Sequence, residues 1–165
     1  MHHSGGHSTF DNIRAGHMCT PNPTGKSTLT PTAPCDSYRY GLADIGYHYG
    51  ITENGDVYQL RPINVRGAHV GGANTGTVGV VLAGNFREET VSSVQLNALR
   101  NVVGFLKTSY PSITHLAGHR DFDTSNTCPG DHLLELLPSI AVEYNLTYGT
   151  GGYKLPDYLS TPTPH

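Results

Sequence analysis

The stretch Ala117-Gly118-His119-Arg120-Asp121-Phe122, which runs on to Thr127-Cys128-Pro129-Gly130, decides what kind of protein this chain forms. It brings an imidazole and a thiol together across a short polar turn. Imidazole nitrogen and thiolate sulfur are ligands that suit zinc. Two ligands do not complete a zinc site, so a third must come from elsewhere in the chain. The histidine pair His2-His3 near the start is the place to look.

Length and composition set the broad class. The chain has 165 residues, enough for one domain with a hydrophobic core. Its 20 glycines and 11 prolines favour a loop-rich α/β protein over a helical bundle. The net charge of −3 gives no broad cationic field for nucleic acid. No apolar run is long enough for a membrane span, and the residues after Met1 are too polar for a signal peptide.

Periodicity predicts the elements around the motif. Strands are expected over residues 44–51, 57–60, 78–84 and 114–118, with Asn54-Gly55 as a two-residue hairpin turn. Helices are expected over residues 8–18, from Ser92 to just before Pro111, and from Asp131 onward. The middle helix should bury one face, formed by Val94, Leu99, Val102, Val103 and Leu106. The glycine-rich loop 66–74 lacks the spacing of a nucleotide-binding turn, so no phosphate site is predicted there.

Two segments allow more than one interpretation. Cys19 and Cys35 bracket a loop rich in threonine and proline, which favours a disulfide; the alternative is a pair of free thiols. His2 and His3 are either metal ligands or part of a frayed, solvated terminus, because no strand precedes them.

Four motifs stand in order along the chain: His2-His3-Ser4, then Asp44-Ile45-Gly46-Tyr47-His48-Tyr49, then Gly67-Ala68-His69-Val70 with Asn74, and finally Gly118-His119-Arg120-Asp121 leading to Cys128-Pro129-Gly130-Asp131. Together they resemble the type 2 N-acetylmuramoyl-L-alanine amidases, a family that includes amidase-type phage lysozymes and peptidoglycan recognition proteins. The resemblance covers residues 2–144. Each motif alone is weak, but four in this order at workable spacings are specific.

The resemblance implies an α/β fold with a central mixed β-sheet flanked by helices and zinc at the floor of a surface groove. It places the zinc ligands at His2, His119 and Cys128, the catalytic tyrosine at Tyr47 and a substrate-binding residue at His69. Residues 1–147 would form the domain, and the Gly/Thr/Pro-rich residues 148–165 a tail or linker.

The implied activity is zinc-dependent hydrolysis of the amide bond between N-acetylmuramic acid and L-alanine. The partner would be bacterial peptidoglycan, and the protein a monomer that is secreted, periplasmic or delivered to the cell wall by a phage.

The chain departs from the family pattern in two places. Two residues before the cysteine ligand the family usually has lysine or threonine, whereas this chain has Asn126, so the second catalytic role is open between Asn126, Thr127 and Thr124. The strand that precedes the first ligand in the family is also missing from this sequence.

Other interpretations of the same residues remain. Tyr47 is equally typical of an ordinary strand tyrosine, His48 of a structural histidine, and Asp121 of a residue that holds the loop. Two rival functions follow: a non-catalytic peptidoglycan-binding module, and a cysteine hydrolase that uses Cys128 with His119. The first rival would be expected to lack the cysteine, and the second does not account for His2 or Tyr47.

Overall fold

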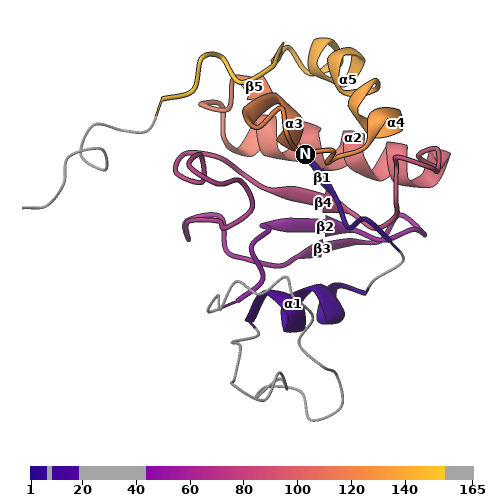
Figure 1. Ribbon diagram of the computed structural model, residues 1–165. Coiled ribbons are helices and arrows are strands. Elements are labelled where there is room, and N and C mark those ends of the chain that lie inside the picture. Colours follow the sequence, from indigo (N-terminus) through magenta and orange to yellow (C-terminus); the bar gives the residue numbers. More distant parts are fainter. Residues whose placement is uncertain (7–8, 19–43, 155–165) are drawn as a thin grey trace, which may run out of the picture.

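The computed structural model describes residues 1–6, 9–18 and 44–154. At its centre is a mixed sheet of four strands in the order β1-β4-β2-β3 (Figure 1). The strands are β1 (His2–His3), β4 (Val80–Leu82), β2 (Tyr49–Ile51) and β3 (Val57–Gln59). β4 is parallel to both β1 and β2, whereas β2 and β3 are antiparallel. The predicted α/β class with a central mixed sheet is confirmed.

The β2–β3 hairpin is present, but its turn is longer than predicted. Ile51 pairs with Val57, and the Thr52 N–H donates to the Asp56 carbonyl at 2.9 Å. The loop therefore consists of residues 53–55, with Gly55 at φ +83°. A three-residue hairpin loop needs a left-handed residue at its end, and glycine takes that conformation without strain.

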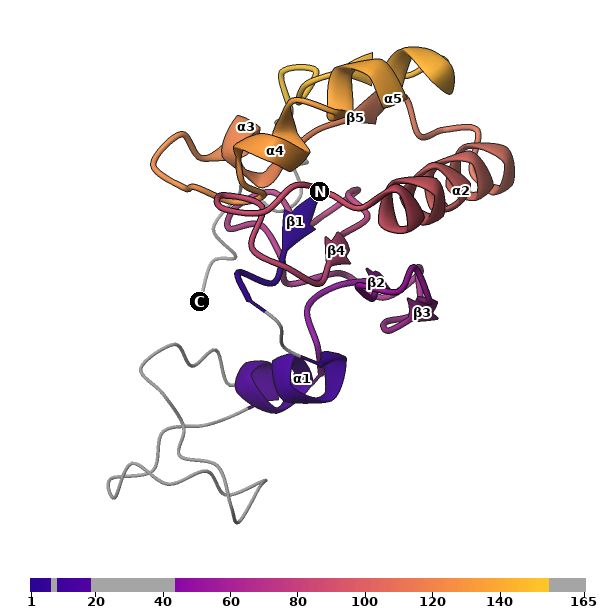
Figure 2. The ribbon, with the colours of Figure 1, turned by 90° about the vertical axis from the view of Figure 1, so that its right-hand side faces the viewer.

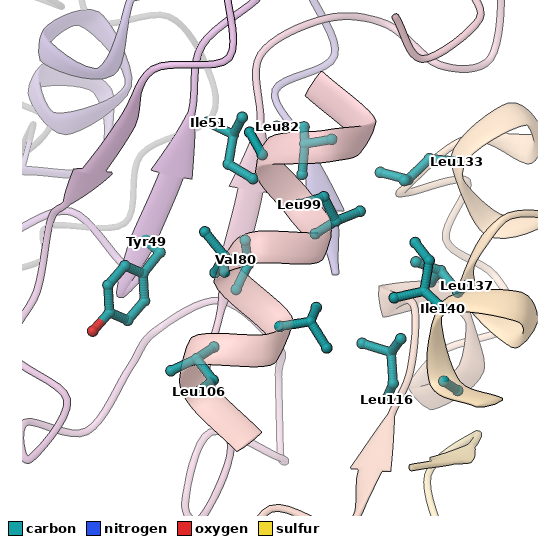
Figure 3. Close-up of a cluster of buried hydrophobic side chains, with 14 of the residues drawn as sticks. Tyr49, Ile51, Val80, Leu82, Leu99, Leu106, Leu116, Leu133, Leu137 and Ile140 are labelled. Carbon is teal, nitrogen blue, oxygen red and sulfur yellow. The ribbon is translucent and has the colours of Figure 1, made fainter. Parts of the chain in front are cut away.

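The long helix α2 (Ser93–Ser109) covers one face of the sheet and supplies much of the core. Leu99, Val102, Val103 and Leu106 are buried as predicted, and Figure 3 shows two of them between the strands and α5. Val94 is 54% exposed, so its inclusion in the buried face was wrong. It lies in the first turn, beside the hairpin loop at Gly55.

The start of α2 is fixed by Ser92, as predicted from the sequence. The Ser92 hydroxyl oxygen accepts a hydrogen bond from the Gln95 N–H at 3.2 Å. The Gln95 side-chain amide in turn donates to the Ala83 carbonyl at 2.8 Å, which ties the helix to the end of β4.

Replacement of Ser92 with alanine should lower the free energy of unfolding by about 1 kcal/mol, because the start of the helix loses its cap. Ser93→Ala is the matched control, since Ser93 is exposed in the first turn of the same helix. Equal destabilisation of both variants in urea unfolding would contradict the assignment of Ser92 as the cap.

The C-terminal part of the fold forms a second layer. The region after Asp131 contains two helices, α4 (Asp131–Leu134) and α5 (Leu137–Glu143), instead of one. Pro138 has no backbone N–H to continue the first helix, and it occupies the first turn of the second. The short strand β5 (His115–Leu116) pairs with β6 (Thr147–Tyr148) in a separate parallel sheet.

Helix α1 (Phe10–Met18) lies on the side of the central sheet away from α2, α4 and α5 in both views (Figures 1 and 2). The Phe10 ring packs against Gly50 of β2, where an added Cβ would come within 2.6 Å of the ring. Tyr49 and Ile51, on either side of Gly50, belong to the core beside α2. The alternation of side chains along β2 thus explains why the two helices pack on opposite faces.

Three predictions concern the ends of the chain and the loop near its start. His2 and His3 form strand β1, and both side chains are buried, so the frayed-terminus interpretation was wrong. The expected Cys19–Cys35 disulfide lies outside the described residues. Past residue 147, the Tyr153 hydroxyl donates to the Thr75 carbonyl at 2.8 Å, and the boundary between domain and tail stays a prediction.

Among the described residues, no helix is long and apolar enough to cross a membrane.

Candidate metal centre

Backbone hydrogen bonds bring the first and the last of the four sequence motifs together. In β1, His2 pairs with Val81 of β4. On the other side of β1, the His119 N–H donates to the Met1 carbonyl at 3.0 Å. His119 is the first residue of α3 (His119–Phe122), so the end of β5 delivers it to β1. His2 and His119 are therefore held side by side, with ring centroids 4.7 Å apart.

The loop that carries Cys128 is held by Arg120. The Arg120 N–H donates to the Cys128 carbonyl at 2.9 Å, and its guanidinium donates to the carbonyls of Asn126 and Thr127 at 3.2 and 2.8 Å. The same guanidinium pairs with Asp131. The Asn126 side-chain oxygen accepts the Cys128 N–H at 2.8 Å. These bonds turn the cysteine toward β1.

The resulting cluster joins His2, His119 and Cys128, whose possible ligand atoms all lie within 4.8 Å of one another. The Cys128 Sγ lies 3.6 Å from His2 Nδ1. In a tetrahedral zinc site, bonds of about 2.3 Å to sulfur and about 2.0 Å to nitrogen place those two atoms about 3.5 Å apart. The sulfur also accepts the His3 N–H at 3.4 Å. The donor set and its spacing fit zinc.

His3 does not belong to this cluster. Successive residues of a strand point to opposite faces, so His3 faces away from His2. Its Nδ1 accepts the Phe86 N–H at 3.1 Å, which gives it a structural role at the end of β4.

Tyr47 and His69 lie against the same histidine. The ring centroid of His2 is 5.1 Å from that of Tyr47 and 5.1 Å from that of His69. His2 Nε2 lies 3.1 Å from His69 Nδ1. All five residues predicted for the site thus lie together, and His69 contacts a predicted metal ligand directly.

Burial controls the protonation of the cluster. It lowers the pKa of His2 well below 6.5, lowers that of His119, and lowers the pKa of His69 from 6.5 to about 3. Burial also raises the pKa of the Cys128 thiol, an effect that the His3 N–H partly opposes. At neutral pH the imidazoles are uncharged, which leaves their lone pairs available to a cation.

A cavity of about 340 Å³ opens beside the cluster. His2, His69 and His119 line it together with apolar residues of the core, among them Val103 and Leu106 of α2. Phe122 and Tyr153, whose ring centroids are 5.9 Å apart, close another side. The histidine cluster therefore borders a concave space.

Two residues near the cluster, His48 and Asp121, have the structural roles predicted from the sequence. His48 Nε2 is 2.9 Å from the Val65 carbonyl, which confirms a structural histidine. The Asp121 carboxylate accepts the Gly118 N–H at 2.8 Å and the Tyr148 hydroxyl at 3.1 Å, so it holds the loop as predicted.

Two further residues had no predicted role. His17 of α1 accepts the Gly46 N–H at 2.9 Å, and its ring centroid lies 5.4 Å from that of Tyr47. Arg120 was quoted within the motif without a function, yet it binds three parts of the Cys128 loop. Neither role has a recognisable sequence signal, because His17 contacts a segment 29 residues away and Arg120 binds mainly backbone carbonyls.

The lowered histidine pKa values predict acid sensitivity of the metal-free protein. Between pH 6.5 and about 3 the unfolded chain protonates His69 whereas the folded protein does not, so stability is full above pH 6.5 and falls as the pH decreases. Each such histidine contributes at most about 1.4 kcal/mol per pH unit. Urea unfolding of the chelated protein between pH 7 and 5 should show this loss, and His69→Gln should reduce its slope. An unchanged slope in that variant, equal to that of the exposed-site control His132→Ala, would contradict the prediction.

Comparison with known proteins agrees with this geometry. Peptidoglycan-recognition protein LB of Drosophila melanogaster is 32% identical over 124 residues, which cover 74% of this chain and 53% of that protein. Peptidoglycan recognition protein 1 of Mus musculus is 33% identical over 132 residues, covering 76% and 70%. The chain thus spans about half the length of the Drosophila relative.

Solved structures give the same result. The N-acetylmuramoyl-L-alanine amidase LysC from Clostridium intestinale superposes with a TM-score of 0.63 at 28% identity, covering 88% of this chain and 83% of that one. Bumblebee peptidoglycan recognition protein SA gives 0.66 at 26% identity, covering 89% and 80%. Residues 1–131 match the N-acetylmuramoyl-L-alanine amidase family, and this confirms the resemblance predicted from the four motifs. The chain is a member of the type 2 N-acetylmuramoyl-L-alanine amidase family, which includes the peptidoglycan recognition proteins.

Proposed function

We propose that this protein is a zinc-dependent amidase that hydrolyses the bond between N-acetylmuramic acid and L-alanine in bacterial peptidoglycan. One observation carries the proposal: His2 Nδ1 and Cys128 Sγ lie 3.6 Å apart, with His119 within reach of both and Tyr47 against His2. Family membership supports the choice of reaction.

In this proposal His2, His119 and Cys128 hold the metal. Zinc in such a site supplies Lewis acidity, which polarises a carbonyl and activates water. In this proposal the Tyr47 phenol, which is half-buried beside His2, donates a hydrogen bond to the oxygen that becomes negative as the amide is attacked. The adjoining cavity, which His2 and His119 line, offers the substrate a place to bind next to two of the metal ligands.

The second catalytic role stays open between Asn126, Thr124 and Thr127, which all belong to the Cys128 loop. The Asn126 side-chain oxygen is engaged by the Cys128 N–H, an arrangement that suits a residue holding the ligand loop. Thr124 and Thr127 are both exposed on that loop. A threonine hydroxyl and the Asn126 amide N–H can each donate to an oxyanion, so all three residues remain candidates for this role.

The location of the substrate determines where such an enzyme would work. Peptidoglycan lies outside the cytoplasm, so the proposed enzyme is secreted, periplasmic or delivered by a phage; that it acts as a monomer stays a prediction.

The second candidate is a non-catalytic peptidoglycan-binding module. Relatives named peptidoglycan recognition proteins favour it. A module that only binds has no need of a metal cluster, whereas this chain keeps all three ligand residues within 4.8 Å. Retention of the cluster therefore favours the enzyme.

The test combines zinc content with the release of new amino groups from purified peptidoglycan. Native protein, chelated protein and chelated protein given zinc should be compared. About one zinc per chain, with activity lost on chelation and restored by zinc, is the expected result. Zinc binding without release of amino groups would favour the binding module, and absence of zinc would overturn the proposal.

A further inference from the structure

The imidazole of His69 is enclosed so tightly that its ring has one orientation. Gly67 and Gly79 lie on it from two directions, and a Cβ on either would come within 2.5 Å of the ring carbon Cδ2. Real Cβ atoms do not approach that closely, so both positions require glycine. The backbone at His69 is held as well, because the Asn74 side-chain oxygen accepts the N–H groups of His69 and Val70 at 2.7 and 2.9 Å.

The contacts of Thr77 decide which ring nitrogen of His69 carries hydrogen. The Thr77 hydroxyl donates to the Ala73 carbonyl at 2.7 Å, so its single proton is engaged there. Its oxygen faces His69 Nε2 at 3.5 Å and can only accept. A hydrogen bond across this contact needs the hydrogen of the neutral ring on Nε2, which would make His69 Nδ1 the unprotonated acceptor.

The tautomer of His69 determines which ring nitrogen of His2 carries hydrogen. His2 Nε2 lies 3.1 Å from His69 Nδ1, and a hydrogen bond there needs the proton on His2 Nε2. His2 Nδ1 is then unprotonated, and it is the nitrogen that lies 3.6 Å from Cys128 Sγ. In the opposite tautomers, His2 Nδ1 would carry hydrogen and point it at the position of the metal. Metal-binding histidines commonly have their second nitrogen fixed in this way.

We propose that His69 is a positioning residue that holds His2 in the tautomer with Nδ1 free, through a hydrogen-bond chain from the Ala73 carbonyl to Thr77, His69 and His2. The inference rests on the metal site of the proposed function. It assigns His69 a role different from the substrate contact that the family resemblance implies, since the residue acts through the ligand rather than on the substrate.

The first test uses the native, metal-free protein at neutral pH. Nitrogen-15 NMR of the histidine rings distinguishes an N–H nitrogen from a lone-pair nitrogen, without any need for activity. We expect both His2 and His69 to carry hydrogen on Nε2. Hydrogen on Nδ1 of either ring would overturn the proposal.

The second test compares two substitutions at the same position by zinc titration. His69→Leu removes the acceptor and should weaken zinc binding about 10–100-fold. His69→Gln keeps an acceptor oxygen and should recover part of that loss. His132→Leu, at an exposed histidine, is the matched control and should leave zinc affinity unchanged. Equal weakening by the leucine and glutamine variants would show that His69 only fills space.

The outcomes separate this inference from the proposed function. If native protein binds no zinc, the metal site itself fails. If native protein binds zinc and the His69→Leu variant, checked as folded by thermal unfolding, binds it with native affinity, only the role of His69 is overturned.

Discussion

Replacement of Cys128 with alanine should remove bound zinc and lower amidase activity by more than about 100-fold. Loss of an outer-shell partner of a metal ligand already costs up to about 100-fold in affinity or activity, and loss of a ligand costs more. The two remaining imidazoles, His2 and His119, would leave the ion with too few protein ligands. Zinc content and release of amino groups from peptidoglycan measure the two effects together, with His132→Ala as a control for an exposed side chain.

A second substitution at Cys128 distinguishes a metal ligand from a nucleophile. Aspartate can ligate zinc but has no thiol, so Cys128→Asp should retain part of both the zinc and the activity. A cysteine hydrolase would lose all activity in this variant while Tyr47 and His2 remained dispensable. The raised pKa of the Cys128 thiol, caused by its burial, also disfavours a free thiolate nucleophile.

Replacement of Tyr47 with phenylalanine should lower kcat by about 10²–10³, the range observed when one hydrogen-bond donor to an oxyanion is lost. The ring and its contacts with His2 and His17 would remain, so zinc content and thermal stability should stay at native values. Tyr58→Phe is the matched control, because Tyr58 is 50% exposed on β3.

Measuring kcat and zinc content separately distinguishes a catalytic role of Tyr47 from a role in supporting the metal ligand. If Tyr47→Phe lost zinc, the tyrosine would support the ligand His2 rather than the reaction. If it retained full activity, Tyr47 would be the ordinary strand tyrosine that the sequence alone also allows.

Much of the fold was predictable because its signals are local. Ser92 and the apolar spacing that follows it predict α2, and a continuous apolar run predicts β4. The errors arise where contacts between residues distant in the sequence determine the structure. Val94 has helical spacing but lies beside the hairpin loop, and His2 and His3 form a strand because they pair with β4, about 79 residues further along the chain.

The candidate site also contains some features that were predictable from the sequence and others that were not. His119 and Cys128 are close in sequence and share a recognisable pattern, so their proximity was predictable. The place of His69 was predicted from the family resemblance, but its contact with His2 was not, because it joins two residues that are 67 positions apart in the sequence. The part played by Arg120 was not predicted for a different reason: besides Asp131, its partners are backbone carbonyls, which cannot be recognised from residue types.

The position of β1 has a consequence for how the molecule assembles. His2 and Cys128 are separated by 126 residues, so their contact closes almost the whole domain into a single loop. Contacts of such long range reward the chain only after the intervening segments are in place, and they form late in folding. A cation that binds only the finished cluster would favour the folded chain by mass action, by about 2.7 kcal/mol at a concentration 100 times its Kd. Metal supply would then influence how much of the protein is folded as well as how much is active.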